Sequence, residues 1–295
     1  MDKHLKVIGC GVFERELQEL ASDSENRVDV EMLDAGLHRA PEKLRLRLQD
    51  AIDRASEAGC YDAIALAYGL CGRGVAGIEA REVPLVIPRA HDCIALFLGS
   101  RERYMEEFQE SPGTFYFTTG WCEKKSHPQD FGPRSAERAD PENHPHFREF
   151  AEKYGKDNAC YIVGFLESWR RNYSRAAFVD HGFGRPEHEE QARAVADELD
   201  WNYEKIEGSL ELLRDLLDGN WDDERFQVVE PEHRLLLSGH ADLFETVPAH
   251  QGAAEKQAEQ KPSSAAYGEQ RTGRMPEGRL GLGIDAGGTF TDSVL

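Results

Sequence analysis

The 295-residue sequence has no long hydrophobic run and no close pair of cysteines, and each absence excludes a class of protein. No segment approaches the roughly 18 consecutive apolar residues that a membrane-spanning helix needs. The first residues lead directly into a strand pattern, without the basic, apolar and small-residue regions of a signal peptide. The sequence therefore predicts a cytoplasmic protein with no membrane segment.

Positive charge is also scarce. The chain has 35 lysine and arginine residues against 55 aspartate and glutamate residues, which gives a net charge of −20. A general binder of nucleic acid or of anionic membranes needs a basic surface, so the composition argues against both functions. The acidic residues are spread along the expected helices, where they are best explained as solvated faces.

Six cysteines are too few and too scattered for a disulfide scaffold of this length, and no CxxC pair is present. They are Cys10, Cys60, Cys71, Cys93, Cys122 and Cys160. In a cytosolic protein, such thiols are core residues, metal ligands or nucleophiles more often than disulfides.

Apolar runs alternate with amphipathic segments along most of the chain. The pattern predicts strands at 5–10, 28–36, 62–70, 84–88, 114–120, 176–182, 202–208 and 225–231. It predicts helices at 13–22, 41–59, 93–110, 160–174, 186–200 and 209–219, with a break near Gly99. Continuous apolar strands indicate sheets covered on both faces by helices. We therefore expect an α/β protein with two mostly parallel-sheet, three-layer lobes.

Composition divides the chain into four parts. A first α/β lobe is expected at 1–120, and an irregular polar loop followed by a second lobe at 121–247. Residues 248–278 lack periodicity and predict a flexible linker. Residues 279–295 predict an incomplete, truncated β-hairpin around a Gly-Gly turn.

Cysteine and histidine residues follow several predicted strands of this fold. Cys10 ends the first strand, His38 follows the second and Cys71 follows the third, while His91 and Cys93 follow the fourth. Ligands bind at the carboxyl ends of strands in parallel α/β sheets. The sequence thus predicts a site at this edge, although any one of the thiols could equally be a small core residue.

Thiolate and imidazole are ligands for zinc and other transition metals. We expect a metal held by Cys10, Cys71 and Cys93 with His91 or His38 as a further ligand. Another possibility is a metal-free enzyme site with Cys93 as the nucleophile and His91 as the base. Whether His181 or Cys122 joins the site stays open.

Polar residues on the same loops are candidates for supporting roles. Tyr68 is a candidate catalytic residue, and Arg73 and Arg89 are candidates for binding a cofactor or an anion. Asp92 could orient a ligand from the same loop.

The C-terminal stretch "GIDAGGTFTDSVL" resembles the first phosphate loop of actin-like ATPases, most closely the hydantoinase and oxoprolinase branch and the reductive activators of corrinoid proteins. The resemblance implies nucleotide-phosphate contacts by Asp285, Gly287, Gly288, Thr289, Thr291 and Asp292. It covers about the last 15 residues only, so an ATPase module in cis is expected if the natural chain continues.

Residues 1 to about 245 resemble a family catalogued as domain of unknown function 1638. The motifs that carry the resemblance are "IGCGVFERELQEL", "LDAGLHRAPEKL", "YGLCGRGVAGIEA", "PLVIPRAHDCIALFLGSRERY" and "PGTFYFTTGW". The family name supplies no activity, but its members are encountered alongside corrinoid-dependent methyl transfer.

Two functions follow as expectations. The first is a zinc-binding or other metal-binding protein of methyl-group or corrinoid metabolism, which as an enzyme would be a metal-dependent methyl transferase. Its substrate would be a small molecule or a corrinoid protein, with the corrinoid supplied by a partner. The alternative is a non-catalytic module that binds a ligand or partner and delivers it to an associated ATPase.

Overall fold

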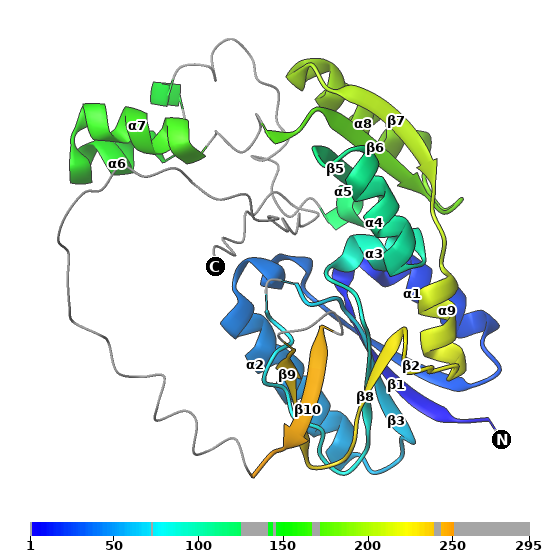
Figure 1. Cartoon of the computed structure of the whole chain (residues 1–295). Helices are drawn as coiled ribbons and strands as arrows, with labels where there is room; N and C mark the ends of the chain where they lie inside the picture. The colour runs from blue at the N-terminus through cyan, green and yellow to red at the C-terminus, as the bar shows by residue number, and fades with distance from the viewer. Residues whose placement is uncertain are drawn as a thin grey trace, which may run out of the picture.

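The computed structural model describes residues 2–71, 73–124, 141–143, 146–166, 172–238 and 243–250. Within them, a five-stranded sheet has the order β2-β1-β3-β4-β8, and a three-stranded sheet has the order β5-β6-β7. The expected α/β class with mostly parallel sheets is confirmed (Figure 1). The predicted linker at 248–278 lies almost wholly outside the described residues, and the predicted phosphate-loop hairpin at 279–295 lies outside them entirely.

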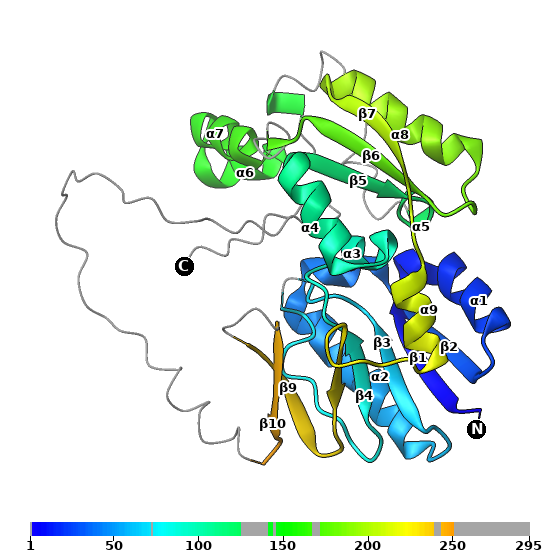
Figure 2. The same ribbon diagram turned by 45° about the vertical axis from the view of Figure 1, so that its right-hand side comes forward.

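The first sheet holds four parallel strands and one antiparallel strand. Its strands are β1 (His4–Cys10), β2 (Arg27–Leu33), β3 (Ala63–Ala67), β4 (Leu85–Pro88) and β8 (Phe226–Val229). The helix α2 (Pro41–Glu57) covers one face, while α1 (Glu14–Asp23) and α9 (Glu211–Asp218) pack together on the other (Figure 2). Ala63–Ala67 and Leu85–Pro88 are buried throughout, as strands with covered faces must be.

The second sheet is fully parallel and has an aromatic core. It comprises β5 (Thr114–Thr118), β6 (Arg175–Asp180) and β7 (Asn202–Glu207), with α8 (Pro186–Leu199) packed against β6 and β7. Phe115, Phe117 and Phe178 are buried on these strands and join one cluster. Arg175 in β6 is nearly buried, and it is neutralised by Glu107 and Glu204 at 2.7 Å each.

Two short helices connect the sheets. The predicted break near Gly99 is confirmed, because α3 (Cys93–Leu98) and α4 (Arg101–Glu110) are separate helices. Gly99 has a φ of 84°, which glycine adopts without a Cβ clash, and Ser100 caps α4 by accepting a hydrogen bond from the Arg103 amide. Side chains from both sheets, including Val7 and Val179, belong to one hydrophobic cluster, so the sheets share a core.

The strand predicted at 225–231 was wrongly assigned to the second series. In the structure, β8 returns to the first sheet and pairs antiparallel with β4. Conversely, β5 falls within the range predicted for the first lobe, 1–120, but pairs with β6. Apolar periodicity reports a strand's burial and does not report its partner, because both sheets contain strands with buried residues.

The remaining elements were incompletely predicted. They are η1 (Gly11–Phe13), η2 (Ala35–Arg39), α5 (Thr119–Lys124), η4 (Pro141–Asn143), α6 (Phe147–Tyr154), α7 (Lys156–Leu166), β9 (His233–Leu237) and β10 (Phe244–Pro248). The β9–β10 hairpin packs beside β8 and was not predicted. In the part of the chain that the structure describes, no helix is long and apolar enough to span a membrane.

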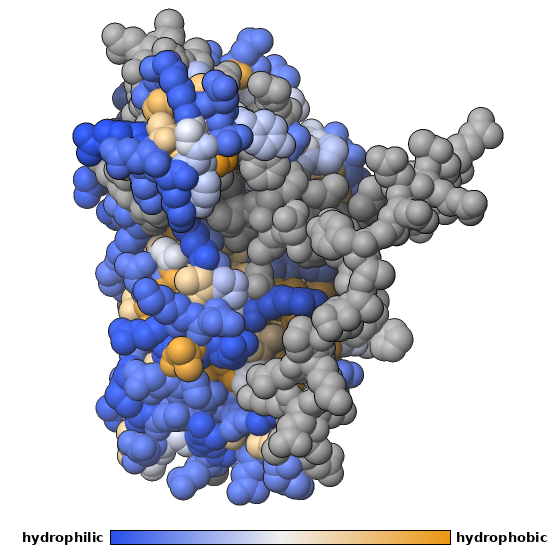
Figure 3. All heavy atoms as spheres, turned by 90° about the vertical axis from the view of Figure 1, so that its left-hand side faces the viewer, coloured by the Kyte–Doolittle hydropathy of each residue, from blue (hydrophilic) through white to orange (hydrophobic). Residues whose placement is uncertain are grey.

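On the face shown in Figure 3, hydrophilic side chains predominate among the coloured residues, and hydrophobic side chains are visible in the hollow at mid-height. The large hydrophobic side chains that are exposed in the described residues are Leu46, Met105, Tyr154 and Tyr161. They lie on four different helices, α2, α4, α6 and α7.

The close approach of α5 to η1 can be tested by a substitution at Gly120. A Cβ at this position would overlap the backbone carbonyl oxygen of Val12, which cannot move aside as a side chain can. We expect Gly120→Ala to lower the free energy of unfolding by about 1–3 kcal/mol, as overpacking does. Gly164 in α7 has no atom near its Cβ position, so Gly164→Ala is the control and should stabilise by about 0.5–1 kcal/mol. Urea denaturation of both variants measures the difference, and equal stabilities would contradict this packing.

Candidate functional site

A small cavity lies at the carboxyl ends of the parallel strands in the first sheet. The chain passes from β1 to β2 on one side and then to β3 on the other, so the carboxyl ends of β1 and β3 form the point where the strand order reverses. Ligands of open α/β sheets bind at this point. The cavity is lined by Cys10, Val12, Phe13, Asp34, Ala35, Leu37, His38, Tyr68, Cys71, Cys93 and Trp121.

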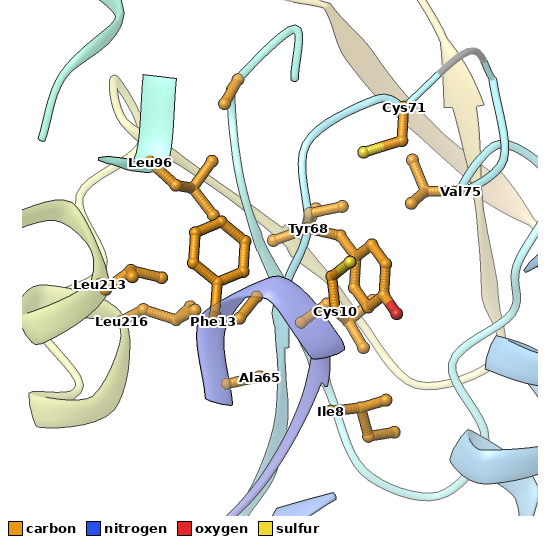
Figure 4. Close-up of a cluster of buried hydrophobic side chains, with 14 of the residues drawn as sticks. Ile8, Cys10, Phe13, Ala65, Tyr68, Cys71, Val75, Leu96, Leu213 and Leu216 are labelled. Atoms are coloured by element: carbon orange, nitrogen blue, oxygen red, sulfur yellow. The ribbon is translucent and has the colours of Figure 1, made fainter. Parts of the chain in front are cut away.

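Three predicted thiols reach this cavity. Cys10 ends β1, Cys71 follows β3 and Cys93 begins α3 after β4. Cys10 and Cys71 are buried, whereas Cys93 is partly exposed. Figure 4 shows the Tyr68 ring beside Cys10, with Cys71 on the neighbouring loop. The sequence-based expectation that these thiols share one edge of the sheet agrees with this placement.

The loops after β3 and β4 are fastened to each other. The amides of Leu70 and Cys71 donate to the carbonyls of Ala90 and His91 at 2.9 and 3.2 Å. Gly69 permits this approach, because a Cβ there would lie 2.6 Å from the backbone carbonyl carbon of Asp92. The Asp92 carboxylate caps α3 by accepting from the Ile94 amide at 2.9 Å. The two loops that carry Cys71 and Cys93 are therefore held as one unit.

Cys71 has an unusual backbone. Its φ of 44° and the φ of 73° at Arg73 lie in the left-handed region, which non-glycine residues rarely adopt. Such conformations cost of order 1–3 kcal/mol each and cluster at functional sites. The strain at Cys71 occurs where its thiol enters the cavity lining.

His38 is the imidazole that lines the cavity. Its Nδ1 lies 2.7 Å from the carbonyl oxygen of Ala35, and because a carbonyl only accepts, Nδ1 carries the proton. Its Nε2 is buried and has no hydrogen-bond partner in the described part of the chain. The ring therefore presents an unused lone pair. Metal-binding histidines show this arrangement, with one nitrogen donating to a carbonyl and the other left for the metal.

Tyr68 adds a second unsatisfied group to the lining. Its side chain is 2% exposed, and its hydroxyl has no hydrogen-bond partner among the described residues. Burial raises the pKa of Tyr68 well above its usual value, and the nearby Cys10, Cys71 and Asp34 raise it further. The phenol is therefore neutral, and its ring lies beside Cys10.

The donors that line the cavity do not form a complete metal site in this arrangement. In the described ranges, no group of three or more His, Cys, Asp or Glu side chains is placed to hold a metal ion. The cavity measures about 20 Å³, which is enough for one water-sized species. The donor types fit zinc, but their positions would have to close around an ion.

Other predicted residues lie elsewhere. His91 does not line the cavity; burial and the positive charge of Arg101 lower its pKa. The guanidinium of Arg89 donates to the carbonyl oxygens of Asp223 and Phe244 and to the Gln227 side chain, so it ties β4 to the C-terminal strands. Arg73 is exposed.

The two remaining candidate side chains are also away from the cavity. Cys122 is buried in the second core, where burial raises its pKa to about 12. His181 donates a hydrogen bond from its Nε2 to the Phe97 carbonyl oxygen at 2.8 Å. The predicted phosphate contacts from Asp285 to Asp292 lie outside the described residues.

A larger open hollow adjoins the cavity. It measures about 510 Å³ and shares Asp34 and Ala35 with the cavity lining, while Glu14 and Lys124 form an ion pair on its other side. Sequence reasoning did not select Asp34 or Trp121, since neither belongs to a ligand motif. Asp34 could have been selected only by its position, because it directly follows β2 at the same edge of the sheet.

Residues 32–217, more than half of the chain, match the model of a family described as "Protein of unknown function (DUF1638)". The match includes His38, Tyr68, Cys71 and Cys93, and it begins after Cys10. No curated protein and no solved structure matches the chain.

Proposed function

Because the chain belongs to this family, whose description names no activity, we propose a function from its own residues: it binds a thiophilic metal ion, zinc, in the cavity at the carboxyl ends of β1 and β3. The ligands we propose are Cys10, Cys71, Cys93 and His38. Thiolate and imidazole are the usual donors of tetrahedral zinc sites.

The observation that carries the proposal is the state of His38. Its Nδ1 is anchored on Ala35, while its buried Nε2 has no partner in the described chain and lines a cavity that three thiols also line. A buried acceptor without a partner costs roughly 1–3 kcal/mol. A metal ion would accept the lone pair of this nitrogen, and it would also stabilise the ionised form of the buried thiols.

Binding requires a local adjustment, because the donors are not yet placed around one ion. The cavity of about 20 Å³ suits a single ion, whereas small-molecule pockets measure about 300–1,000 Å³. The loops carrying Cys71 and Cys93 are linked by hydrogen bonds and can move together. Metal binding would then supply the free energy that draws them inward.

The reaction class we propose is methyl transfer in the cytoplasm, with a methylated small molecule or a methyl-corrinoid protein as donor. A cavity thiolate would attack the methyl carbon, so that a sulfur–carbon bond forms as the bond to the leaving group breaks. The electron pair leaves with the donor, which for a methyl-corrinoid is cobalt in its reduced Co(I) form. A metal-bound thiolate stays ionised near neutral pH, and this makes it available as the nucleophile.

A non-catalytic binding module is the second candidate, and the open hollow of about 510 Å³ favours it. This volume falls in the range of small-ligand sites. Such a module would bind the same donor without consuming it. Incubation with a methyl donor followed by mass measurement of the protein separates the two, since only the transferase gains a methyl group on a cysteine.

The metal is tested on protein purified without oxygen. We expect about one equivalent of zinc, and we expect Co²⁺ to replace it with the absorption of a tetrahedral thiolate site. Cys71→Ser and Cys93→Ser should each lose most of the metal at a fixed chelator concentration. Cys60→Ser is the matched control, since Cys60 is exposed and distant from the lining. Less than about a tenth of an equivalent, unchanged in these variants, would overturn the proposal.

A further inference from the structure

A buried carboxyl and a buried imidazole meet where the first sheet's helices contact the second sheet. Glu16 lies in α1, and its side chain is fully buried. His181 directly follows β6, and its side chain is 4% exposed. Glu16 Oε1 lies 3.9 Å from His181 Nδ1. Neither residue lines the cavity of the proposed metal site.

The His181 ring is held in one orientation and one tautomer. Nε2 lies 2.8 Å from the Phe97 carbonyl oxygen, which only accepts, so Nε2 carries a proton. The Phe97 ring lies 5.6 Å from the imidazole, and a Cβ on Gly208 would overlap the imidazole from another direction. In the neutral ring, Nδ1 therefore carries a lone pair, and Glu16 Oε1 is 3.9 Å from it.

Glu16 lacks the partners that would stabilise its charge. Neither carboxyl oxygen has a hydrogen bond of ordinary geometry within the described residues. Burial raises the pKa of Glu16 to about 7, its own backbone amide opposes this, and the charge of Glu123 raises it further. Arg15 lowers it only slightly, because Arg15 is itself hydrogen-bonded to Glu123 at 2.8 Å.

The surroundings of His181 also disfavour a second proton. Burial lowers the pKa of His181, while its hydrogen bond to Phe97 and the charge of Asp180 oppose this effect. Arg103, in α4, lowers it further. The ring lines an open polar hollow with Asp180, Lys205 and Glu207, which gives protons a route from solvent.

We infer that Glu16 and His181 share a single proton across the contact between α1 and the second sheet, and that this proton stabilises that contact. A protonated Glu16 donates to Nδ1 once the 3.9 Å separation closes to hydrogen-bond distance. Loss of the proton leaves a buried carboxylate facing a lone pair, so the contact weakens as the pH rises. The pair is thus a pH-sensitive latch.

The latch lies next to the elements that carry two cavity thiols. Phe97 belongs to α3, which begins at Cys93, and its ring lies 4.3 Å from that of Phe13 in the turn after Cys10. Opening the latch would loosen this packing whether or not the cavity binds metal. The inference is independent of the proposed function.

Infrared spectroscopy of the unaltered protein tests the shared proton directly. We expect the C=O band of one protonated carboxyl at pH 6, and its loss by pH 9. Where the described carboxyl groups other than Glu16 have shifted pKa values, the shift is downward, so such a band belongs to Glu16. No protonated carboxyl at pH 6 would overturn the inference.

Glu16→Gln supplies a second test, since glutamine imitates the protonated acid at every pH. The infrared band should disappear in this variant. Between pH 6 and pH 9 the melting temperature of the parent protein should fall, and that of the variant should fall by several degrees less. Glu19→Gln, at an exposed position of the same helix, should leave both results unchanged. A band that persists in Glu16→Gln would also refute the assignment.

Discussion

His38→Gln is expected to weaken the proposed zinc binding by roughly 100-fold or more, because it removes the imidazole that, among the described residues, lines the cavity with a nitrogen available to a metal. Glutamine preserves much of the size and polarity of the side chain but lacks the basic nitrogen. Competition with a chromophoric chelator at constant pH measures the change. The melting temperature of the metal-free protein should change little, because the variant loses the hydrogen bond to Ala35 but also removes a buried nitrogen without a partner.

His91→Gln is the control for this experiment. The sequence places His91 closer to the thiols than His38, two residues before Cys93, yet its side chain does not line the cavity. We expect its zinc affinity to stay within about threefold of the parent, a difference of less than 1 kcal/mol. If His91→Gln lost the metal and His38→Gln kept it, the proposed ligand set would be wrong.

Zinc affinity should also depend on pH. Thiols must lose their protons to bind the ion, so metal uptake releases protons and affinity rises with pH. Calorimetric titration with zinc in buffers of different ionisation enthalpy gives the number of protons released, and this number reports how many thiols become ligands. Cys71→Ser should reduce that number by one, whereas Cys60→Ser should not change it.

The sheet edge where the cavity lies and the three thiols that line it could be predicted from the sequence, but the choice between His38 and His91 as the histidine beside them could not. Cys10, Cys71 and Cys93 each follow an apolar run that reads as a buried strand, and parallel strands bring such positions to one edge. The choice between His38 and His91 depends on a short turn, Ala35–Arg39, whose first carbonyl fixes the tautomer of His38. No pattern in the sequence encodes that contact.

The partner of β8 and the burial of Glu16 could not be predicted from the sequence either. The run at 226–229 is mostly apolar and would suit either sheet, so the sequence does not show that it returns to β4. Glu16 occupies an acidic first turn of an amphipathic helix, where a solvated carboxylate is the ordinary expectation. The groups that surround it, His181 and the charge of Glu123, are distant in the chain.

The largest effect on stability is expected from Glu16→Gln above neutral pH. A carboxyl whose pKa rises on folding, here from 4.5 to about 7, stabilises the protein fully below pH 4.5, and this stability is lost as the pH rises to 7. A shift of this size corresponds to about 3 kcal/mol, so at pH 8 the variant should be more stable than the parent by up to about that amount. Urea denaturation across the pH range measures the difference.

His181→Leu separates the latch from an isolated buried acid. The pKa of His181 is lowered on folding from 6.5, so its contribution is lost as the pH falls. Between pH 4.5 and 6.5 the folded pair and the unfolded pair each hold one proton, and stability should be nearly constant. In His181→Leu only the effect of Glu16 remains, so the free energy of unfolding should fall as the pH rises above 4.5. In Glu16→Gln only the effect of His181 remains, so the free energy of unfolding should rise with pH up to about pH 6.5. Parallel pH profiles for the parent and both variants would show that the two groups do not share a proton.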